Sequence, residues 1–591
     1  MVKLSSNALH VLQARYLRRD EEGLIVESPE QLFERVARAV AQAELFHGNA
    51  RQAAYWEEEY FKLLSSLDFL PNSPTLMNAG TRLGQLSACF VLPVEDTMEG
   101  IFESLKNMAL IQRTGGGTGF SFSRLRPRGD LVSSTGSEAS GPVSFMKIFD
   151  SATEHIKQGG KRRGANMGIL RVDHPDTLEF VTAKLDGTSL QNFNISVGVT
   201  DMFMDAVSQG HHFDLVHPRT GRISGKLAAR QVFDTIVQSA WRTGDPGLIF
   251  LDTVNRANPL PHLGALEATN PCGEIPLLPY ESCNLSSINL ARMVAGEDKN
   301  PSLDWQKLAS TVQKGVRFLD DVITVNKYSM PEIEHITQAN RKIGLGVMGF
   351  ADMLIRLGVS YDSDEAVEIA GELMHFIAAE ALNASRQLAA ERGVFTNWKG
   401  SVFEAQKVMV RNATRTAVAP TGTISILAGT SPSVEPLFAL AYRRSHVLGD
   451  QTLHETNPIL LEYLQRHHLD ADQVIERILE KGNLKGADGV PDEVKRLFVT
   501  ALEVPPERHL QIQAAFQRNV DNSVSKTINL PEGSRPKDIA EAYWRAWKLG
   551  LKGITVYRYG SKSTQVLELG ADEESPYINH ISKCDPFECK V

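Results

Sequence analysis

The sequence has few cysteines, no long apolar run and no excess of positive charge. Five cysteines in 591 residues are too few for a secreted disulfide scaffold, so we expect a protein of the reducing cytoplasm. No stretch approaches the roughly 18 consecutive apolar residues of a membrane-spanning helix, and the N-terminus lacks the pattern of a signal peptide. The net charge of -9 argues against a general nucleic-acid binder. These absences exclude membrane and nucleic-acid partners from the expected functions.

The composition and the first residues predict a globular protein that begins with helices. Hydrophobic residues make up 42% of the chain and charged residues 23%, which allows a sizeable core in one large α/β body or several domains. Ser28 followed by Pro29 is a typical helix start. Behind it, apolar residues recur at helical spacing, at Leu32, Phe33, Val36, Ala37 and Val40. We therefore expect a helical region over residues 1–84.

From about residue 85 onward, short apolar runs alternate with helical patterns. This alternation favours a mainly parallel sheet covered by helices. The expected strands include 87–94, 165–172 and 192–199, a strand and helix start lie in 414–429, and a strand–helix–strand unit ends the pattern near 560. Long covering helices are predicted at 304–327 and 364–391, and residues 446–518 read as a polar, helix-rich insertion. We expect residues 85–560 to form one body and residues 561–591 to be a flexible tail.

Residues 268–290 contain two of the five cysteines and an unusual grouping around the first of them. In "NPCGE", Pro271 and Gly273 disfavour a helix and favour an extended loop. Alternate residues of an extended chain point the same way, so Asn270, Cys272 and Glu274 are expected to converge. A neighbouring carboxylate disfavours a thiolate, which suits a neutral sulfur with Glu274 acting as a base on a substrate hydroxyl. The alternative is a buried cysteine at a tight turn with a capping Asn.

Six segments together resemble the catalytic subunits of ribonucleotide reductases. They read "NPCGEIPL…CNLSSINL" from residue 270, "PNSPTLMNAG" (71–80), "SACFVLPVEDTMEGI" (87–101), "RTGGGTGFSFSRLRPRG" (113–129), "GGKRRGANMGIL" (159–170) and "APTGTISILAG" (419–429). They follow the family order and extend from about residue 5 to 560. The resemblance implies a ten-stranded α/β barrel of two five-stranded parallel halves, with a central finger loop near residue 272. It also implies that Cys272 carries a transient thiyl radical assisted by Asn270 and Glu274.

The other four cysteines acquire roles from the same resemblance. Cys89 and Cys283 match the pair that is oxidised to a disulfide in each turnover. Cys584 and Cys589 lie in the last eight residues, and two thiols are too few for a closed zinc site. They fit a mobile dithiol that reduces the Cys89–Cys283 disulfide by exchange and is itself reduced by a thioredoxin- or glutaredoxin-like protein. No metal site made of protein side chains is expected.

The resemblance further implies where nucleotides bind. Residues 420–425, which follow a strand-like run and start a helix, suit phosphate through backbone N–H groups and the hydroxyls of Thr421, Thr423 and Ser425; an ordinary capped helix is the alternative. Asp96, Lys161, Arg162 and Arg163 match a site at a dimer edge where a deoxynucleotide or ATP effector tunes substrate choice; a solvated basic loop is the alternative. The residues matched to substrate contacts are Ser73, Ala88, Cys89, Gly117, Asn270, Pro271, Cys272, Gly273, Glu274, Pro420, Thr421, Gly422, Thr423 and Ile424.

The family divides by the source of the radical, and this sequence most resembles the adenosylcobalamin-dependent branch. Near the C-terminal end of the barrel "TVYRYGS" contains Tyr557 but no adjacent tyrosine pair, and the tail has no glycyl-radical segment. The missing Asp-x-His-x-x-Gly motif, which would supply a lower histidine to cobalt, is expected in this branch. The short Cys-x4-Cys tail resembles the di-metal branch instead, so a di-metal-dependent large subunit is the alternative.

The implied activity is the reduction of ribonucleotides, with diphosphates expected, to 2′-deoxyribonucleotides for DNA synthesis and repair. In this scheme Cys272 abstracts the 3′-hydrogen, Glu274 accepts the 3′-hydroxyl proton, and Cys89 protonates the departing 2′-hydroxyl. A homodimer is expected because the effector loop needs a partner surface. Relatives with an ATP-binding module at the N-terminus are inhibited by dATP, and we expect no such inhibition here. A catalytically silent nucleotide-binding regulator is a further alternative, which the complete set of five cysteines disfavours.

Overall fold

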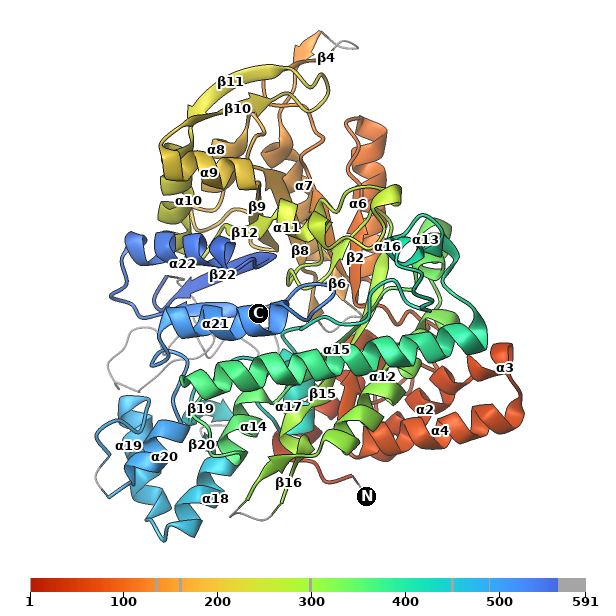
Figure 1. The fold of residues 1–591 in the computed structure, drawn as a ribbon, viewed down its shortest axis with the longest axis vertical. Helices are drawn as coiled ribbons and strands as arrows, with labels where there is room; N and C mark the ends of the chain where they lie inside the picture. The colour runs from red at the N-terminus through yellow and green to blue at the C-terminus, as the bar shows by residue number, and fades with distance from the viewer. Residues whose placement is uncertain are drawn as a thin grey trace.

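The computed structural model describes residues 2–132, 136–158, 162–296, 300–447, 451–487 and 489–561. Figure 1 shows a helical N-terminal region beside a large body in which helices surround a sheet, with the long helix α15 (Asp364–Arg392) crossing the middle. Cys584, Cys589 and Lys161 lie outside the described residues, as does the predicted tail from residue 562 onward.

The N-terminal region is helical, as the sequence predicts. Helix α2 starts at Pro29, the Ser28 side chain accepts from the backbone N–H of Gln31, and Gln31 bonds back to Ser28. The five apolar residues of the predicted stripe are fully buried, because residues spaced three and four apart share one helix face. The helices are α1 (Ser6–Val11), η1 (Leu12–Tyr16), α2 (Pro29–Ala41), α3 (Glu44–His47), α4 (Ala50–Ser65) and α5 (Ser73–Asn78).

Five parallel strands form the first half of the main sheet. They pair in the order β2 (Cys89–Leu92), β3 (Gly117–Ser121), β8 (Asn166–Arg171), β9 (Phe193–Val199) and β12 (Gly247–Phe250). Helical crossovers connect them, as parallel strands require. These crossovers include α6 (Met98–Gln112), α7 (Pro142–His155), α8 (Thr177–Thr182), α9 (Asp201–Gln209) and α10 (Ala229–Thr243).

The second half is also parallel. Strand β15 (Ser282–Asn289) pairs with β18 (Ile343–Met348), and bridges continue from Leu345 to Thr416 and from Val418 to Val524. The chain at 524 leads into β21 (Thr527–Leu530), which pairs with β22 (Gly553–Arg558). The helices of this half are α12 (Trp305–Val325), α13 (Pro331–Asn340), α14 (Phe350–Arg356), α15, α17 (Gly422–Ala428), α21 (Pro506–Gln517) and α22 (Pro536–Lys548).

Two antiparallel seams join the halves into a closed ring. At one seam β2 pairs with β15, where Cys89 lies opposite Cys283. At the other seam β12 pairs with β22, where Leu248 lies opposite Ile554. The ring therefore contains ten strand segments, five from each half, and the predicted barrel is confirmed. Outside the ring, β1 (Phe69–Pro71) extends the sheet by pairing with β15.

Smaller elements decorate the barrel. Residues 446–518 contain several helices, as expected of a helix-rich segment, and a hairpin of β19 (Ala441–Val447) and β20 (Gln451–Thr456) precedes them. The other elements are β4 (Leu131–Val132), β5 (Ser137–Glu138), β6 (Lys157–Gln158), β7 (Arg162–Arg163), β10 (His212–Val216), β11 (Ile223–Ala228), α11 (Leu251–Arg256), η2 (Pro261–Leu263), β13 (Ala268–Thr269), β14 (Pro276–Leu277), η3 (Leu290–Met293), β16 (Val294–Ala295), β17 (Ser302–Leu303), η4 (Thr396–Trp398), α16 (Val402–Ala405), α18 (Pro458–Arg466), α19 (Ala471–Lys481) and α20 (Asp492–Leu497).

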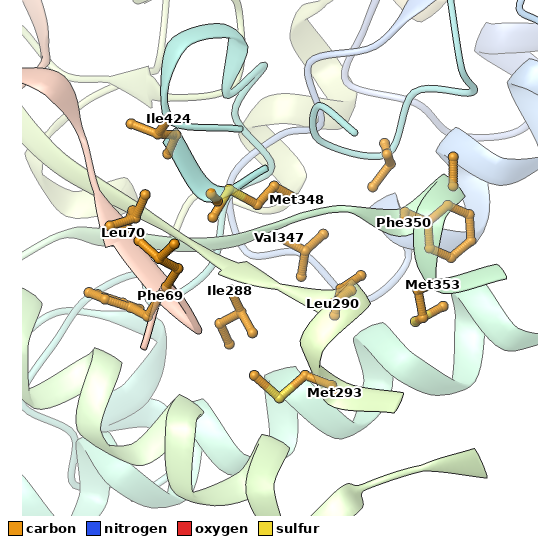
Figure 2. Close-up of a cluster of buried hydrophobic side chains, with 14 of the residues drawn as sticks. Phe69, Leu70, Ile288, Leu290, Met293, Val347, Met348, Phe350, Met353 and Ile424 are labelled. Carbon is orange, nitrogen blue, oxygen red and sulfur yellow. The ribbon is translucent and has the colours of Figure 1, made fainter. Parts of the chain in front are cut away.

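A large apolar cluster joins the N-terminal helices to the second half of the barrel. Figure 2 shows part of it, with Leu70 of β1 and Ile424 of α17 among the side chains around β15 and β18. Helix α17 packs against β1 and against α1. Because burial of apolar surface stabilises these contacts, the cluster holds the start of α17 near the segment that follows β1.

Among the described residues, no helix combines the length and the apolar character that crossing a membrane requires.

Candidate active site

The loop that contains Cys272 lies inside the ring of strands. Strands β13 and β14 pair as a short hairpin with residues 270–275 at its tip, and β13 contacts β2, β3 and β8. Asn194 of β9 donates its Nδ2 to the carbonyl oxygen of Pro271 at 2.8 Å. From the other half, the backbone N–H of Ser523 donates to the carbonyl oxygen of Glu274 at 2.8 Å. Contacts from both halves hold the tip between them, which corresponds to the expected finger loop.

Strand β3 admits the finger loop because it carries glycine at two positions that face it. A Cβ atom on Gly119 would lie 1.6 Å from the carbonyl oxygen of Thr269, and one on Gly117 would lie 2.8 Å from Cγ of Pro271. Backbone atoms cannot approach that closely to a side-chain carbon, so at Gly119 the loop itself would have to move. The glycines of the GGGTG sequence thus allow the finger loop to lie close against the backbone of β3, and they determine where the loop lies.

We expect the Gly119→Ala substitution to displace the finger loop. A misplacement of about 1 Å at a reacting group can lower kcat by about 10²-fold, and overpacking lowers the free energy of unfolding by about 1–3 kcal/mol. Gly371 in α15 is the matched control, because a Cβ there meets no atom within 4 Å. Steady-state turnover and denaturant unfolding check both changes; equal behaviour of the two alanine variants would show that β3 does not position the loop.

The tip of the loop is a turn, so Asn270, Cys272 and Glu274 do not project in parallel as they would from an extended chain. The N–H of Gly273 donates to the carbonyl oxygen of Asn270 at 3.1 Å, with Gly273 at φ +81°. Cys272 therefore sits at the corner and is exposed, whereas Asn270 and Glu274 are buried. The expectation of side-by-side projection from an extended chain was wrong, but the turn still gathers these residues at one place.

The Asn270 amide links the carboxyl group to the sulfur of Cys89. Its Nδ2 donates to Glu274 Oε2 at 2.8 Å and to Cys89 Sγ at 3.2 Å, while its Oδ1 accepts from the N–H of Ile275 at 3.0 Å. Burial raises the pKa of Glu274 to about 7, against the lowering effect of the Asn270 hydrogen bond. A carboxyl group with that pKa is divided between its acid and base forms near neutral pH, which suits proton transfer.

Cys89 and Cys283 are buried, and both are held in the neutral thiol form. Burial raises the pKa of each thiol, and the neighbouring Glu274 carboxylate raises that of Cys89 further. Negative charge on Cys283 or on Cys272 raises the pKa of Cys89 as well. Directly opposed residues of an antiparallel pair have Cα atoms about 4.5–5.5 Å apart, within the range a disulfide needs. The register of β2 and β15 therefore permits the predicted disulfide.

The predicted phosphate segments lie together near the N-terminal helices. Ser73 begins α5, and Thr421, at φ +56°, precedes α17. The Thr421 hydroxyl accepts from the N–H of Ser433 at 2.7 Å, and the Ser425 hydroxyl donates to the carbonyl oxygen of Gly422 at 3.4 Å. Two of the three hydroxyls assigned to phosphate thus bond within their own half of the barrel. The third belongs to the half-buried Thr423 and accepts from Nη1 of Arg15 at 3.5 Å.

Sequence comparison assigns the whole described body to one family. The sequence profile of "Ribonucleotide reductase, barrel domain" matches residues 87–409 and 404–557, and that of "Ribonucleotide reductase, all-alpha domain" matches residues 2–84. The chain belongs to the ribonucleotide reductase family. The resemblance found in the six motifs is thereby confirmed.

Curated relatives and a solved structure match over nearly the full chain. The vitamin B12-dependent ribonucleoside-diphosphate reductase of Thermoplasma acidophilum is 50% identical over 97% of this chain and 81% of its own length. The protein of the same name from Mycobacterium tuberculosis (strain CDC 1551 / Oshkosh) is 51% identical over 96% and 81%. The alpha subunit of the class Id ribonucleotide reductase of Actinobacillus ureae is 26% identical, with a TM-score of 0.76, covering 94% of this chain and 97% of that chain.

At the effector position expected for a ribonucleotide reductase, Asp96 is paired. Its carboxylate accepts from Nε of Arg126 at 2.9 Å and from the Arg126 backbone N–H at 3.1 Å. Arg162 and Arg163 form strand β7, paired with β6. Lys161 lies outside the described residues, and the effector assignment stays a prediction.

Three residues that contact predicted site residues were missed from the sequence: two hold the finger loop and one pairs with Asp96. Asn194 is the exposed position in an otherwise buried strand, and a polar residue in an apolar run was a usable signal. Arg126 lies within the quoted RLRPRG segment, where nothing distinguished it from its neighbours. Ser523 acts through its backbone N–H, which no side-chain pattern can indicate.

Proposed function

We propose that this chain reduces ribonucleoside diphosphates to 2′-deoxyribonucleoside diphosphates by thiyl-radical chemistry, with adenosylcobalamin as the source of the radical. The observation that carries the proposal is the Asn270 amide, which bonds at once to the Glu274 carboxyl group and the Cys89 sulfur. Cys283 lies opposite Cys89 across the seam. A base, a proton donor and a second thiol thus stand beside an exposed thiol at the loop tip.

The exposure of Cys272 fits a hydrogen donor to a bulky external cofactor, since the other two active-site thiols are buried. Adenosylcobalamin, when bound, supplies the radical that removes the hydrogen atom of the Cys272 thiol. The relatives named vitamin B12-dependent, at 50% and 51% identity, support this source over a separate di-metal subunit.

The protein's own residues carry the remaining steps. The Cys272 sulfur takes the 3′-hydrogen, and the Glu274 carboxylate accepts the 3′-hydroxyl proton. Cys89, kept protonated by its raised pKa, protonates the 2′-hydroxyl, which leaves as water. Cys89 and Cys283 then give two electrons and form a disulfide, while the Cys283 hydrogen goes to C2′ and the Glu274 proton returns to the 3′-oxygen. Cys272 returns a hydrogen atom to C3′ and is again a thiyl radical. The sum is one ribonucleotide and two thiols converted to one deoxyribonucleotide, one disulfide and water.

Each turnover consumes two thiols, so the scheme needs a reductant. We assign that task to Cys584 and Cys589, which a thioredoxin- or glutaredoxin-like protein in the reducing cytoplasm would reduce again.

A deoxynucleotide or ATP effector would act through Asp96 and residues 161–163. The effector site is expected at the edge of a homodimer. The helices α6 and α7 pack together and expose Met98 (56%), Phe102 (45%) and Ile148 (40%), an apolar face suited to a homodimer.

The experiment is an anaerobic assay of the purified chain with CDP or UDP, adenosylcobalamin and a small dithiol. We expect dCDP and dUDP to form without a second protein. Formation of product only after a di-metal subunit is added would support the alternative radical source, and binding of nucleotides without any reduction would indicate a silent regulator. Without the dithiol, product should stop after about two equivalents, because the Cys89–Cys283 pair and then the Cys584–Cys589 pair become oxidised, and peptide mapping should find both disulfides.

A further inference from the structure

Two consecutive residues at the end of η1 contact both segments to which substrate phosphate is assigned. The hydroxyl of Tyr16 lies 2.7 Å from Oγ of Ser73, and Nη1 of Arg15 lies 3.5 Å from Oγ1 of Thr423. Ser73 and Thr423 are far apart in the sequence and belong to different elements. The N-terminal helical region therefore spans the gap between them.

Packing fixes η1 in this place. Leu12 and Tyr16 are buried in the large apolar cluster, with exposures of 0% and 3%. Helix α1, which runs directly into η1, packs against α17, and η1 itself packs against α5. Arg15 is half-buried, so its stem is held while its end reaches the Thr423 hydroxyl.

The site beside Arg15 is connected to the reacting sulfurs. The backbone N–H of Asn72, the residue before Ser73, donates to the carbonyl oxygen of Leu285 at 2.9 Å. Leu285 lies two residues after Cys283 on β15, a rise of about 7 Å along the strand. A nucleotide with its sugar at Cys89 and Cys283 thus has its phosphates within reach of Ser73 and of the residues that face it.

A guanidinium group beside two hydroxyls is suited to phosphate. Its planar fork carries five N–H donors and can bond two oxygens of one phosphate group, and such charge-assisted bonds are stronger than neutral ones. The hydroxyls of Ser73 and Thr423 add uncharged hydrogen-bond donors on either side of it. The arginine would strengthen the binding of a nucleoside diphosphate, which carries negative charge, and would not strengthen the binding of an uncharged nucleoside.

We propose that Arg15 binds the diphosphate group of the nucleotide substrate and that Tyr16 positions Ser73 for the same group. This inference rests on the proposed function, because it takes Ser73 and Thr423 as substrate contacts. It adds η1 to the substrate site, which the sequence analysis had assigned to the barrel and to the segment at Ser73.

The test compares Arg15→Gln with Arg18→Gln in the full chain. Arg18 is exposed three residues away, so the control removes the same charge without removing a contact to Thr423. For Arg15→Gln we expect KM for CDP to rise about 10- to 100-fold, the range of a lost charge-assisted hydrogen bond, with kcat changed by less than about threefold. Arg15→Lys should recover part of the loss, because it keeps the charge but not the fork. Tyr16→Phe should raise KM by less than Arg15→Gln.

Equilibrium dialysis of CDP and of cytidine against the chain without cofactor gives a second readout. Arg15→Gln should weaken CDP binding by the same factor as KM and leave cytidine binding unchanged. The inference is overturned if KM and the affinity for CDP are the same in Arg15→Gln, Arg18→Gln and the unmodified chain. It is also overturned if both glutamine variants lose the same amount of CDP affinity. If Arg15→Gln does not fold, an unchanged KM in Arg15→Lys decides against it. Failure of the unmodified chain to make dCDP counts against the proposed function, while the dialysis comparison still decides the role of Arg15.

Discussion

We expect the Cys272→Ser substitution to abolish nucleotide reduction, with turnover of CDP falling by at least about 10⁴-fold, as when a residue central to a catalytic unit is lost. Serine matches cysteine in shape, and position 272 is exposed at the corner of a turn, so the fold has no reason to change. The O–H bond of serine is much stronger than an S–H bond, so a radical cannot move to the side chain. Binding of CDP should stay within about twofold, because Cys272 holds no phosphate.

A matched variant, Cys283→Ser, separates the radical step from the reduction step. It should make little dCDP, since the second thiol is missing, but Cys272 can still remove hydrogen from C3′. The exposed Cys272 thiol then exchanges with water, so tritium from 3′-labelled CDP should appear in the solvent for Cys283→Ser and not for Cys272→Ser. Measurable dCDP from Cys272→Ser, or tritium release from it, would remove Cys272 from the mechanism.

Local patterns in the sequence predicted the elements that carry these residues. The Ser28 cap and apolar stripe predicted α2, and helical periodicity over 304–327 and 364–391 predicted α12 and α15 to within a few residues. Alternation of strands and helices predicted the parallel halves of the sheet. These features depend on near neighbours in the chain, where spacing and side-chain type carry the information.

Such local patterns could not predict contacts between segments that are distant in the sequence. The opposition of Cys89 and Cys283 depends on the β2–β15 seam, which spacing cannot indicate, so it came only from the family resemblance. The direction of Cys272 depends on a turn closed by Gly273, and an extended chain was the wrong geometry for it. Likewise the contact of Arg15 with Thr423 joins two residues 408 positions apart in the chain, and nothing near Arg15 marks it.

The Glu274→Gln substitution has two effects of opposite sign. As the proposed base, Glu274 is worth about 10²–10⁴-fold in rate, so kcat for CDP should fall by that factor. In the unmodified chain kcat should rise with pH up to about 7, where burial places the pKa of Glu274, and level off above it. The glutamine variant should lose this dependence. A flat pH profile in the unmodified chain would show that another group accepts the proton.

Stability should change in the other direction, because the folded state holds the Glu274 proton more tightly than the unfolded state does. The pKa rises from 4.5 to about 7 on burial, so between these values the unfolded chain loses its proton first and increasing pH favours unfolding. At 1.36 kcal/mol per pKa unit the cost reaches about 3 kcal/mol above pH 7. Glutamine carries no charge and can still accept the Asn270 hydrogen bond. Denaturant unfolding should therefore find Glu274→Gln more stable than the unmodified chain by up to about 3 kcal/mol near pH 8. Near pH 4.5 the two chains should be nearly equal in stability. A variant less stable at both pH values would mean that the surroundings stabilise the carboxylate, and the assignment of a raised pKa would fail.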